Sequence, residues 1–309
     1  RQGGTGADYN RTAGADLNLV LGKDARLTGY LAKTFTPGIT KHDWAGAVDF
    51  AYLVDKYNYG LTYLDVGRDF NAEMGYIRRT DIRNPQARGY WTPRPGWRGV
   101  RQLSIGGQFD TYATHAGTIE SRTADGEFAV TFDDTSVLSA TVARDYDLLT
   151  DPFRLGNGVI EPGGYRWNTT RVSYSSNPRL RVTGSGSIAT GGYYSGEKTT
   201  MSAGLSVLPS ETLLVELSYN RNRIDLPATP RYVTNTVSTR VSYSFSPTLF
   251  AKGYVQYNDE RKLASLNLLL WAIYRPGSDL YVVYNQGWNT DLPGPHAVQV
   301  KNRSLAVQP

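Results

Sequence analysis

The feature that most constrains this chain is a two-residue alternation of apolar and polar side chains along extended segments. From Leu249 to Asn258, Lys252, Gln256 and Asn258 fall at even positions. Apolar or small residues fill every odd position of the same segment: Leu249, Ala251, Gly253, Val255 and Tyr257. Successive side chains of a β-strand point to opposite faces of its sheet. The segment therefore predicts a strand that is apolar on one face only.

The next segment predicts a hairpin that continues the same sheet. Leu266, Leu268 and Leu270 form an apolar face within residues 263–274, and the alternation resumes at 279–285 after Pro276-Gly277. Proline presets φ at the first central position of a tight turn, and glycine accepts a positive φ at the second.

The pattern recurs along the whole chain, and no segment has a convincing helical period. It gives about seventeen strands of roughly 10–14 residues, whereas strands of soluble sheets usually have ~5–6 and a bilayer-crossing strand needs ~9–11. The predicted fold class is all-β: an antiparallel transmembrane β-barrel of about 16–18 strands, occupying residues 1–309. A soluble β-sandwich or propeller is the alternative that the strand lengths disfavour.

Composition is compatible with such a barrel. The 309 residues include 22 Tyr and no Cys, and their mean hydropathy is −0.42. A barrel strand gives half its side chains to a wet interior, so low mean hydropathy does not exclude a membrane. No apolar run reaches the ~18 residues of a spanning helix. The net charge of +5 is scattered along the chain, which gives no reason to expect a nucleic-acid partner.

The connections divide into two classes. Short turns fall at every second junction, and the loops between them are mostly long, at 36–44, 68–86, 146–164, 190–197, 224–231 and 288–297, with exceptions at 116–117 and 259–261. Outer-membrane barrels have short periplasmic turns and longer extracellular loops. The sequence therefore predicts a location in the bacterial outer membrane, with membrane lipid as a partner.

An odd number of strands cannot close antiparallel. We therefore expect a natural barrel of 18 or more strands, of which residues 1–309 lack the N-terminal strand or strands and an upstream module. The alternative is that one predicted strand is false, and the weakest is the one at 87–92.

Several stretches resemble an uncharacterised bacterial family in which an N-terminal carbohydrate-binding-like module precedes a C-terminal outer-membrane β-barrel. They are 11–17, 31–37, 70–83, 151–153 with Pro162, Gly163 and Tyr165, 255–258 and 274–285. The resemblance covers the barrel part and implies its fold and location, but no biochemical activity. Arg78 stands where the family tends to have proline, and Trp271 and Ile273 stand where it tends to have charge.

No enzyme motif is present, so we expect no catalysis and no cofactor. His42, His115 and His296 lie far apart in the sequence, which favours separate loop or solvated histidines over a shared metal site. Asp145, Asp147 and Asp151 offer oxygen ligands of the kind Ca²⁺ prefers, but an ordinary acidic loop is the favoured interpretation.

The loop at 68–86 is the candidate for an inward-folded constriction, because it is long, charged and distinctive. Asp69, Glu73, Arg78, Arg79 and Arg83 are its candidate residues. Ion pairs among them are expected to pin the loop, in preference to a catalytic pair of Asp69 and Glu73. Rings of arginine lining a pore favour anions. The alternative is an outward loop with no role in passage.

A porin-like passive channel, or an uptake barrel for small or glycan-derived solutes, is the function that the sequence favours. Barrels of 16–18 strands leave an aqueous lumen. The residues predicted to line it are Asp16, Asn18, Asp49, Asn58, Lys252, Gln256, Asn258 and Asn267. The alternative is a scaffold or plugged barrel in a larger envelope assembly. Leu269, Trp271 and Ile273 favour it, since an apolar patch at lumen positions would suit a plug or a protein partner.

Overall fold

The computed structural model describes residues 9–73, 75–156, 158–227, 231–291 and 299–308. Within them all regular structure is β-strand, and no helix could span a membrane. The chain divides into two compact units. The first is made of residues 1–131, 140–155 and 159–170, and the second of residues 132–139, 156–158 and 171–309.

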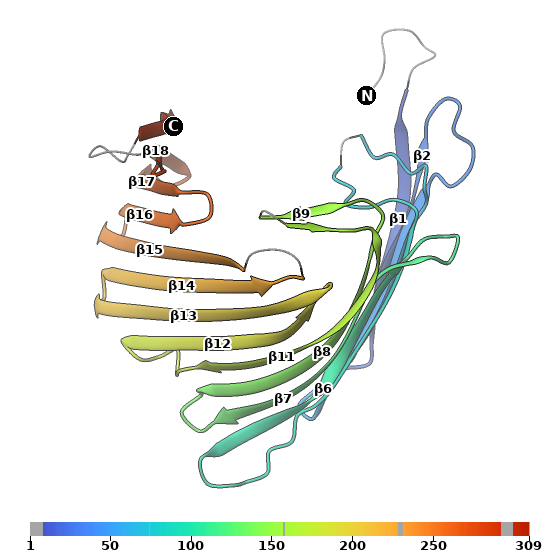
Figure 1. Cartoon of the computed structure of the whole chain (residues 1–309), viewed down its shortest axis with the longest axis horizontal. Coiled ribbons are helices and arrows are strands. Elements are labelled where there is room, and N and C mark those ends of the chain that lie inside the picture. The colour runs from blue at the N-terminus through green and yellow to red at the C-terminus, as the bar shows by residue number, and fades with distance from the viewer. Residues whose placement is uncertain (1–8, 74, 157, 228–230, 292–298, 309) are drawn as a thin grey trace. The chain divides into compact units, whose positions relative to one another are not determined.

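The first unit begins with a run of antiparallel strands that pair in chain order (Figure 1). They are β1 (Arg11–Leu21), β2 (Ala25–Phe35), β3 (Trp44–Val54), β4 (Tyr57–Val66), β5 (Ile82–Trp91) and β6 (Val100–Ala113). The chain then continues through β7 (Ile119–Phe132), β8 (Val137–Leu149), the short pair β9 (Phe153–Leu155) and β10 (Gly158–Ile160), and β11 (Gly163–Ser175).

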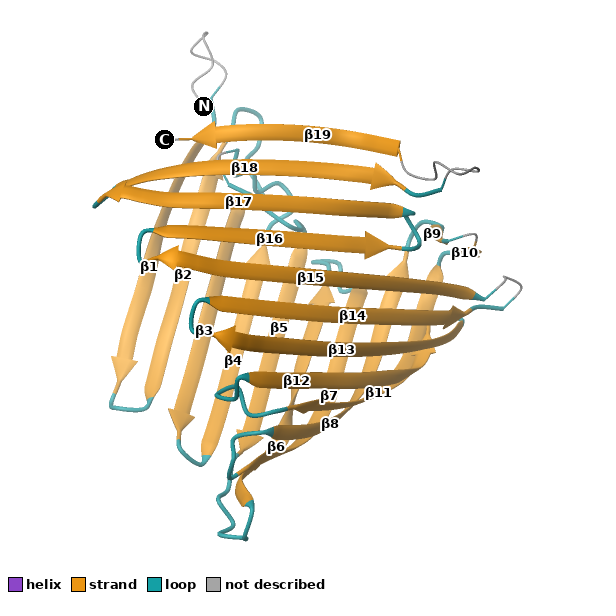
Figure 2. Ribbon diagram, turned by 90° about the vertical axis from the view of Figure 1, so that its left-hand side faces the viewer, coloured by secondary structure: helices purple, strands orange, loops and turns teal. Residues whose placement is uncertain are grey.

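The second unit contains a second run of antiparallel neighbours, which Figure 2 shows lying side by side in chain order. They are β12 (Val182–Tyr193), β13 (Gly196–Ser210), β14 (Leu213–Asp225), β15 (Tyr232–Ser246), β16 (Leu249–Asn258), β17 (Leu263–Arg275), β18 (Ser278–Asn289) and β19 (Gln299–Gln308).

The predicted all-β, antiparallel fold class is confirmed. Seventeen described strands belong to the main sheet, and its longest have 15 residues. Even a 10-residue strand extends about 34 Å. The turn at Pro276-Gly277 forms as predicted, with Gly277 at φ 79° and Arg275 paired with Ser278.

The weakest predicted strand is real and begins earlier than expected. The sequence placed residues 68–86 in a loop, but β5 starts at Ile82, and residues 82–86 pair with β4 in register. Pro85 made this stretch resemble a loop, because proline cannot donate to a ladder. In the β5–β6 ladder, Arg83 is opposite Ala113 and the next paired residue is Gln86, so Pro85 lies where pairing with β6 is interrupted.

The predicted long loop at 190–197 is wrong. The β12–β13 ladder continues to Tyr193 and Gly196, and the two strands are joined by Tyr194 and Ser195. The glycines of this stretch are typical of loops, but Gly196 lies at a close approach of two neighbouring strands, β13 and β14. A Cβ on Gly196 would lie 2.1 Å from the carbonyl oxygen of Asp225. Glycine is therefore required there by the neighbouring strand.

The loop predicted at 146–164 is also shorter than expected. Strand β8 extends to Leu149, and the β9–β10 pair occupies part of the connection to β11.

The apolar rows of the second unit are not buried in a dry interior. Leu268, Leu270 and Leu280 are 43%, 42% and 37% exposed. Leu266 and Val282 are partly exposed. Ala45, Val66, Phe70 and Ile82 form a buried apolar cluster in the first unit, whereas the buried apolar residues described in the second unit are Ala189 and Ile224.

Candidate functional site

Each unit carries one polar face, assembled by cross-strand register. Residues directly opposite each other in a ladder lie on the same face. In the first unit one continuous row crosses β1 to β6: Asn18, Thr28, Asp49, Thr62, Gln86 and Asp110. Thr62 donates to Asp49 over 2.6 Å, and Arg26 donates to Asn18 over 3.1 Å. This face is therefore polar and charged.

In the second unit the polar face consists mostly of hydroxyls and amides. One row reads Thr183, Ser206, Glu216, Arg240, Tyr254, Asn267, Asn285 and Ser304. The next reads Ser185, Gly204, Ser218, Ser238, Gln256, Ser265, Gly287 and Asn302. Glu216 and Arg240 are the charged members of these two rows, and they pair at 3.3 Å.

The residues predicted to line a lumen all lie on these two polar faces. Asp16, Asn18, Asp49 and Asn58 share the face in the first unit. Lys252, Gln256, Asn258 and Asn267 share the face in the second. The Oδ1 atom of Asn58 is buried and has no hydrogen-bond partner among the described residues.

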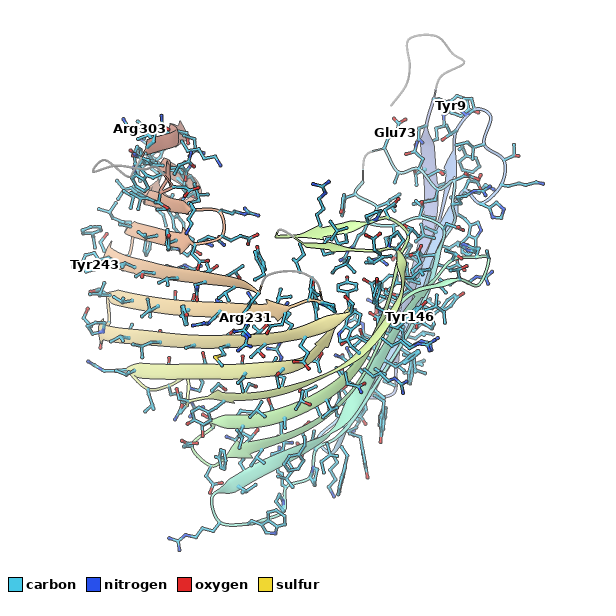
Figure 3. All side chains as sticks on the ribbon, viewed as in Figure 1. Tyr9, Glu73, Tyr146, Arg231, Tyr243 and Arg303 are labelled. Atoms are coloured by element: carbon cyan, nitrogen blue, oxygen red, sulfur yellow. The ribbon has the colours of Figure 1, made fainter. Side chains whose placement is uncertain are left out.

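The opposite faces are apolar and exposed. In the second unit one such row contains Leu205, Leu217, Thr239, Val255 and Leu266. Figure 3 shows Tyr243, which belongs to the same face, near the end of β15 that leads into the 247–248 turn. Its ring meets the Phe245 ring edge-on at 4.6 Å between centroids.

The connection 67–81 packs on the polar face of the first unit. Its residues Phe70, Ala72 and Ile77 contact a cluster on that face: Ala32, Ala45, Leu64, Val66, Ile82 and Tyr112. Phe70 is only 9% exposed. The connection therefore has its own anchor on the sheet.

Backbone hydrogen bonds hold the base of this connection to the first residue of β3 and to the 36–43 connection. Gly67 N–H donates to Trp44 O over 2.8 Å, and Asp69 N–H donates to His42 O over 2.9 Å. The Asn10 side chain donates to Asn71 O over 2.9 Å. Figure 3 shows Glu73 at the same rim of the unit as Tyr9.

The charged residues of the predicted constriction are distributed differently from the expectation. Arg79 pairs with Glu120 at 3.6 Å and lies over the Tyr112 ring, and Asp69 pairs with Arg68 at 3.5 Å. Arg78 and Glu73 are exposed. The ion pairs of Asp69 and Arg79 are thus made with residues outside the predicted set.

Arg83 belongs to β5, on the face opposite the 67–81 connection. It is directly opposite Asp65 in the ladder, and its Nε lies 3.7 Å from Asp65 Oδ2. The role predicted for Arg83 placed it in a loop, whereas the structure places it in a strand.

A cluster around His115 joins three segments of the first unit at this rim: β4, the 67–81 connection and the β6–β7 connection. His115 Nε2 lies 2.7 Å from Asp65 Oδ1, and His115 Nδ1 lies 2.9 Å from Asp81 Oδ1. Tyr63 donates its hydroxyl to Asp65 over 3.2 Å. The Asp65 side chain is 8% exposed and the His115 side chain 17%. This cluster has no signature in the sequence, because His115 and Asp65 are 50 positions apart and its members form no motif.

His115 bridges two carboxylates. Both of its ring nitrogens face carboxylate oxygens, Nε2 toward Asp65 and Nδ1 toward Asp81. One imidazole therefore links β4 to the residue that precedes β5.

The other metal candidates do not assemble. The rings of His42 and His115 lie 6.4 Å apart, which the sequence gave no reason to expect, and His296 lies outside the described residues. Asp145 and Asp151 accept hydrogen bonds from Thr123 and Thr150. Among the described residues, no group of three or more histidine, aspartate or glutamate side chains is arranged to hold a metal ion.

Asp259 lies in the β16–β17 connection of the second unit and accepts hydrogen bonds from Asn235 on β15. Partial burial acts to raise the pKa of Asp259, but hydrogen bonds from the side chain and the backbone N–H of Asn235 outweigh it, and the pKa lies below the ordinary value of 3.8.

An aromatic patch occupies one part of the polar face of the second unit. The Trp271 ring lies 5.0 Å from the Phe250 ring and 5.8 Å from the Tyr281 ring. Leu269 and Ile273 share this face. The Nε1 atom of Trp271 is buried without a hydrogen-bond partner among the described residues.

No protein-family model and no curated protein sequence matches the chain. Among solved structures, it is similar to one described as "Outer-membrane expressed OmpT of Vibrio cholerae". The two sequences are 11% identical, and the match covers 84% of this chain and 88% of that one with a TM-score of 0.38. The chain's own strand lengths, pairing order and two-faced sheets carry the fold assignment.

Proposed function

We propose that the chain forms the wall of a porin-like passive channel in the bacterial outer membrane, for small or glycan-derived solutes. The observation that carries the proposal is the contrast between the two faces of each unit. One face presents rows of hydroxyl, amide and charged groups, and the other presents exposed apolar side chains.

Lipid is the solvent that suits the apolar faces. Soluble monomers rarely expose contiguous apolar patches larger than a few hundred Å². Here exposed apolar side chains recur on strand after strand, with Leu17 and Leu19 on β1, Leu61 on β4, and Leu268 and Leu270 on β17. Strands of this length reach across a bilayer when tilted, and lumen-facing residues then alternate with lipid-facing ones.

Passage is diffusive in this proposal, with no covalent step and no cofactor. The polar faces line the water-filled path, and the 67–81 connection narrows it because it packs on the polar face of the first unit. The exposed Arg78 gives the narrowed section positive charge, whereas the charge of Arg79 is offset by its partner Glu120. Size and charge then determine which solutes pass.

A second candidate is a plugged scaffold barrel within a larger envelope assembly. The aromatic patch around Trp271 favours it, because an apolar surface on an otherwise polar face is suited to a protein partner. In that case the same strands span the membrane, but solutes do not pass.

Conductance of the purified chain in planar lipid bilayers separates the two candidates. A channel gives stepwise, sustained ion current, whereas a plugged scaffold inserts without current. Solubility is measured in parallel, since a lipid-facing protein stays monodisperse only in detergent or lipid. A chain that is monodisperse in plain buffer contradicts both candidates.

A further inference from the structure

A groove on the polar face of the second unit has the features of a ligand site. It has a volume of about 530 Å³, within the ~300–1,000 Å³ of small-molecule pockets. Its walls come from β12 to β16 and the chain just before β12. Ser185, Ser218 and Ser238 belong to its hydroxyl lining.

The floor of the groove depends on Gly204. In the ladders Gly204 stands between Ser185 on β12 and Ser218 on β14. A Cβ at this position would lie 2.7 Å from Ser185 Oγ. The Ser185 hydroxyl therefore lies in the space that a side chain at Gly204 would take, so glycine at this position lets the hydroxyl lie over the neighbouring strand.

The charge of the groove is balanced. Glu216 and Arg240 are its charged lining residues, and they pair with each other at 3.3 Å while remaining 40% and 55% exposed. For an anion or a cation, the attraction of one member of this pair is offset by the repulsion of the other, so the groove favours neither kind of ion. Both side chains keep hydrogen-bonding capacity, since a carboxylate accepts at several sites and a guanidinium has five donors.

The hydroxyls form a regular grid of donors and acceptors. Neighbouring strands lie ~4.8 Å apart, and residues two apart on one strand lie roughly 6.8 Å apart. The Oγ atoms of Ser218 and Ser238 are 2.8 Å apart, and either hydroxyl can donate to the other. A ligand with several hydroxyls on a rigid ring can satisfy such a grid at several points, whereas an apolar ligand would leave it unpaired.

We propose that this groove binds uncharged, polyhydroxylated solutes of the oligosaccharide class. The inference rests on the proposed channel function in one respect, since it names the solute class that the polar face would select. Binding itself needs only the folded sheet.

Isothermal titration calorimetry of the full chain in detergent, with maltotriose as the probe, tests the site. Citrate and spermidine serve as charged comparisons. We expect maltotriose to bind and the charged probes to bind at least about tenfold more weakly. The double variant S218A/S238A removes both partners of one hydrogen bond, so the free energy of unfolding is expected to change little. Maltotriose binding is expected to weaken about tenfold.

The matched control is S265A/S304A, which removes two serines from the same face outside the groove. It is expected to bind maltotriose as the wild type does. Absence of maltotriose binding, equal binding of citrate, or equal losses in the two double variants each overturns the site. Ion current without maltotriose binding would leave the channel standing and reject the site. Maltotriose binding without ion current would leave the site standing and reject the channel.

Discussion

His115 Nε2 lies 2.7 Å from the almost fully buried carboxylate of Asp65. The same ring contacts Asp81 through its other nitrogen, and Arg83 approaches Asp65 from the neighbouring strand. Asp65 is the penultimate residue of β4 and Asp81 directly precedes β5, so one imidazole connects the two ends of the 67–81 connection. This connection is thus held at both ends by His115 and near its start by Phe70.

Substitution of His115 by alanine is expected to loosen the 67–81 connection. It leaves Asp65 buried without one of its partners, which typically costs about 1–3 kcal/mol. The measurements are the free energy of unfolding and the rate of proteolytic cleavage within 67–81. Arg94→Gln, which removes an exposed pair with Asp55, is the control and should change both little. Unchanged cleavage in H115A would contradict the proposed anchoring.

Truncation of Phe70 is expected to detach the connection from the polar face. Phe70 is 9% exposed and packs with Ala45, Val66 and Ile82. Loss of a buried phenylalanine side chain costs about 3–5 kcal/mol in a packed core, here concentrated on one connection. In the proposed channel, F70A should increase single-channel conductance. Tyr76→Ala is the matched control, because Tyr76 is 90% exposed.

Two glycine substitutions should differ sharply although both sites are in the β12–β13 hairpin. A Cβ at Gly196 would lie 2.1 Å from Asp225 O, whereas at Gly186 its nearest neighbour is Ser202 O at 3.8 Å. G196A must displace a backbone and is expected to destabilise the sheet, by about 1–3 kcal/mol for overpacking. G186A is expected to have little effect. Urea unfolding followed by tryptophan fluorescence measures the free energy of unfolding of both variants. Equal losses would contradict the close approach of Gly196 to Asp225 O.

Asp259→Asn is expected to destabilise the protein near neutral pH and not in acid. The folded pKa of Asp259 lies below its ordinary value of 3.8, so its stabilising contribution is present above that value. It is lost as the pH falls through the folded pKa. Because the group is largely exposed, the difference near neutral pH should be below about 1 kcal/mol. Unfolding curves of both proteins from pH 7 to pH 2 should converge; a constant gap would contradict this account.

The strands were predictable because their signal is local. Alternation from Leu249 to Asn258 and the Pro276-Gly277 turn needed only neighbouring residues, and all eight predicted lumen residues share the polar faces because face follows parity. The His115 cluster was not predictable, since it depends on which strand ends meet. The short β12–β13 turn was missed because Gly191, Gly192 and Gly196 have the composition of a loop, while the need for Gly196 comes from Asp225 on the next strand.

The near-absence of buried side chains in the second unit has a practical consequence. In a sheet that is one layer thick, each side chain contacts the medium on its own face and few other residues. Its size is therefore seldom limited by packing against a second layer. Positions such as Val255 or Gln256 should therefore accept bulky labels, including spin probes and fluorophores, with little loss of folding. A label at each such position would report on the medium that its own face of the sheet contacts.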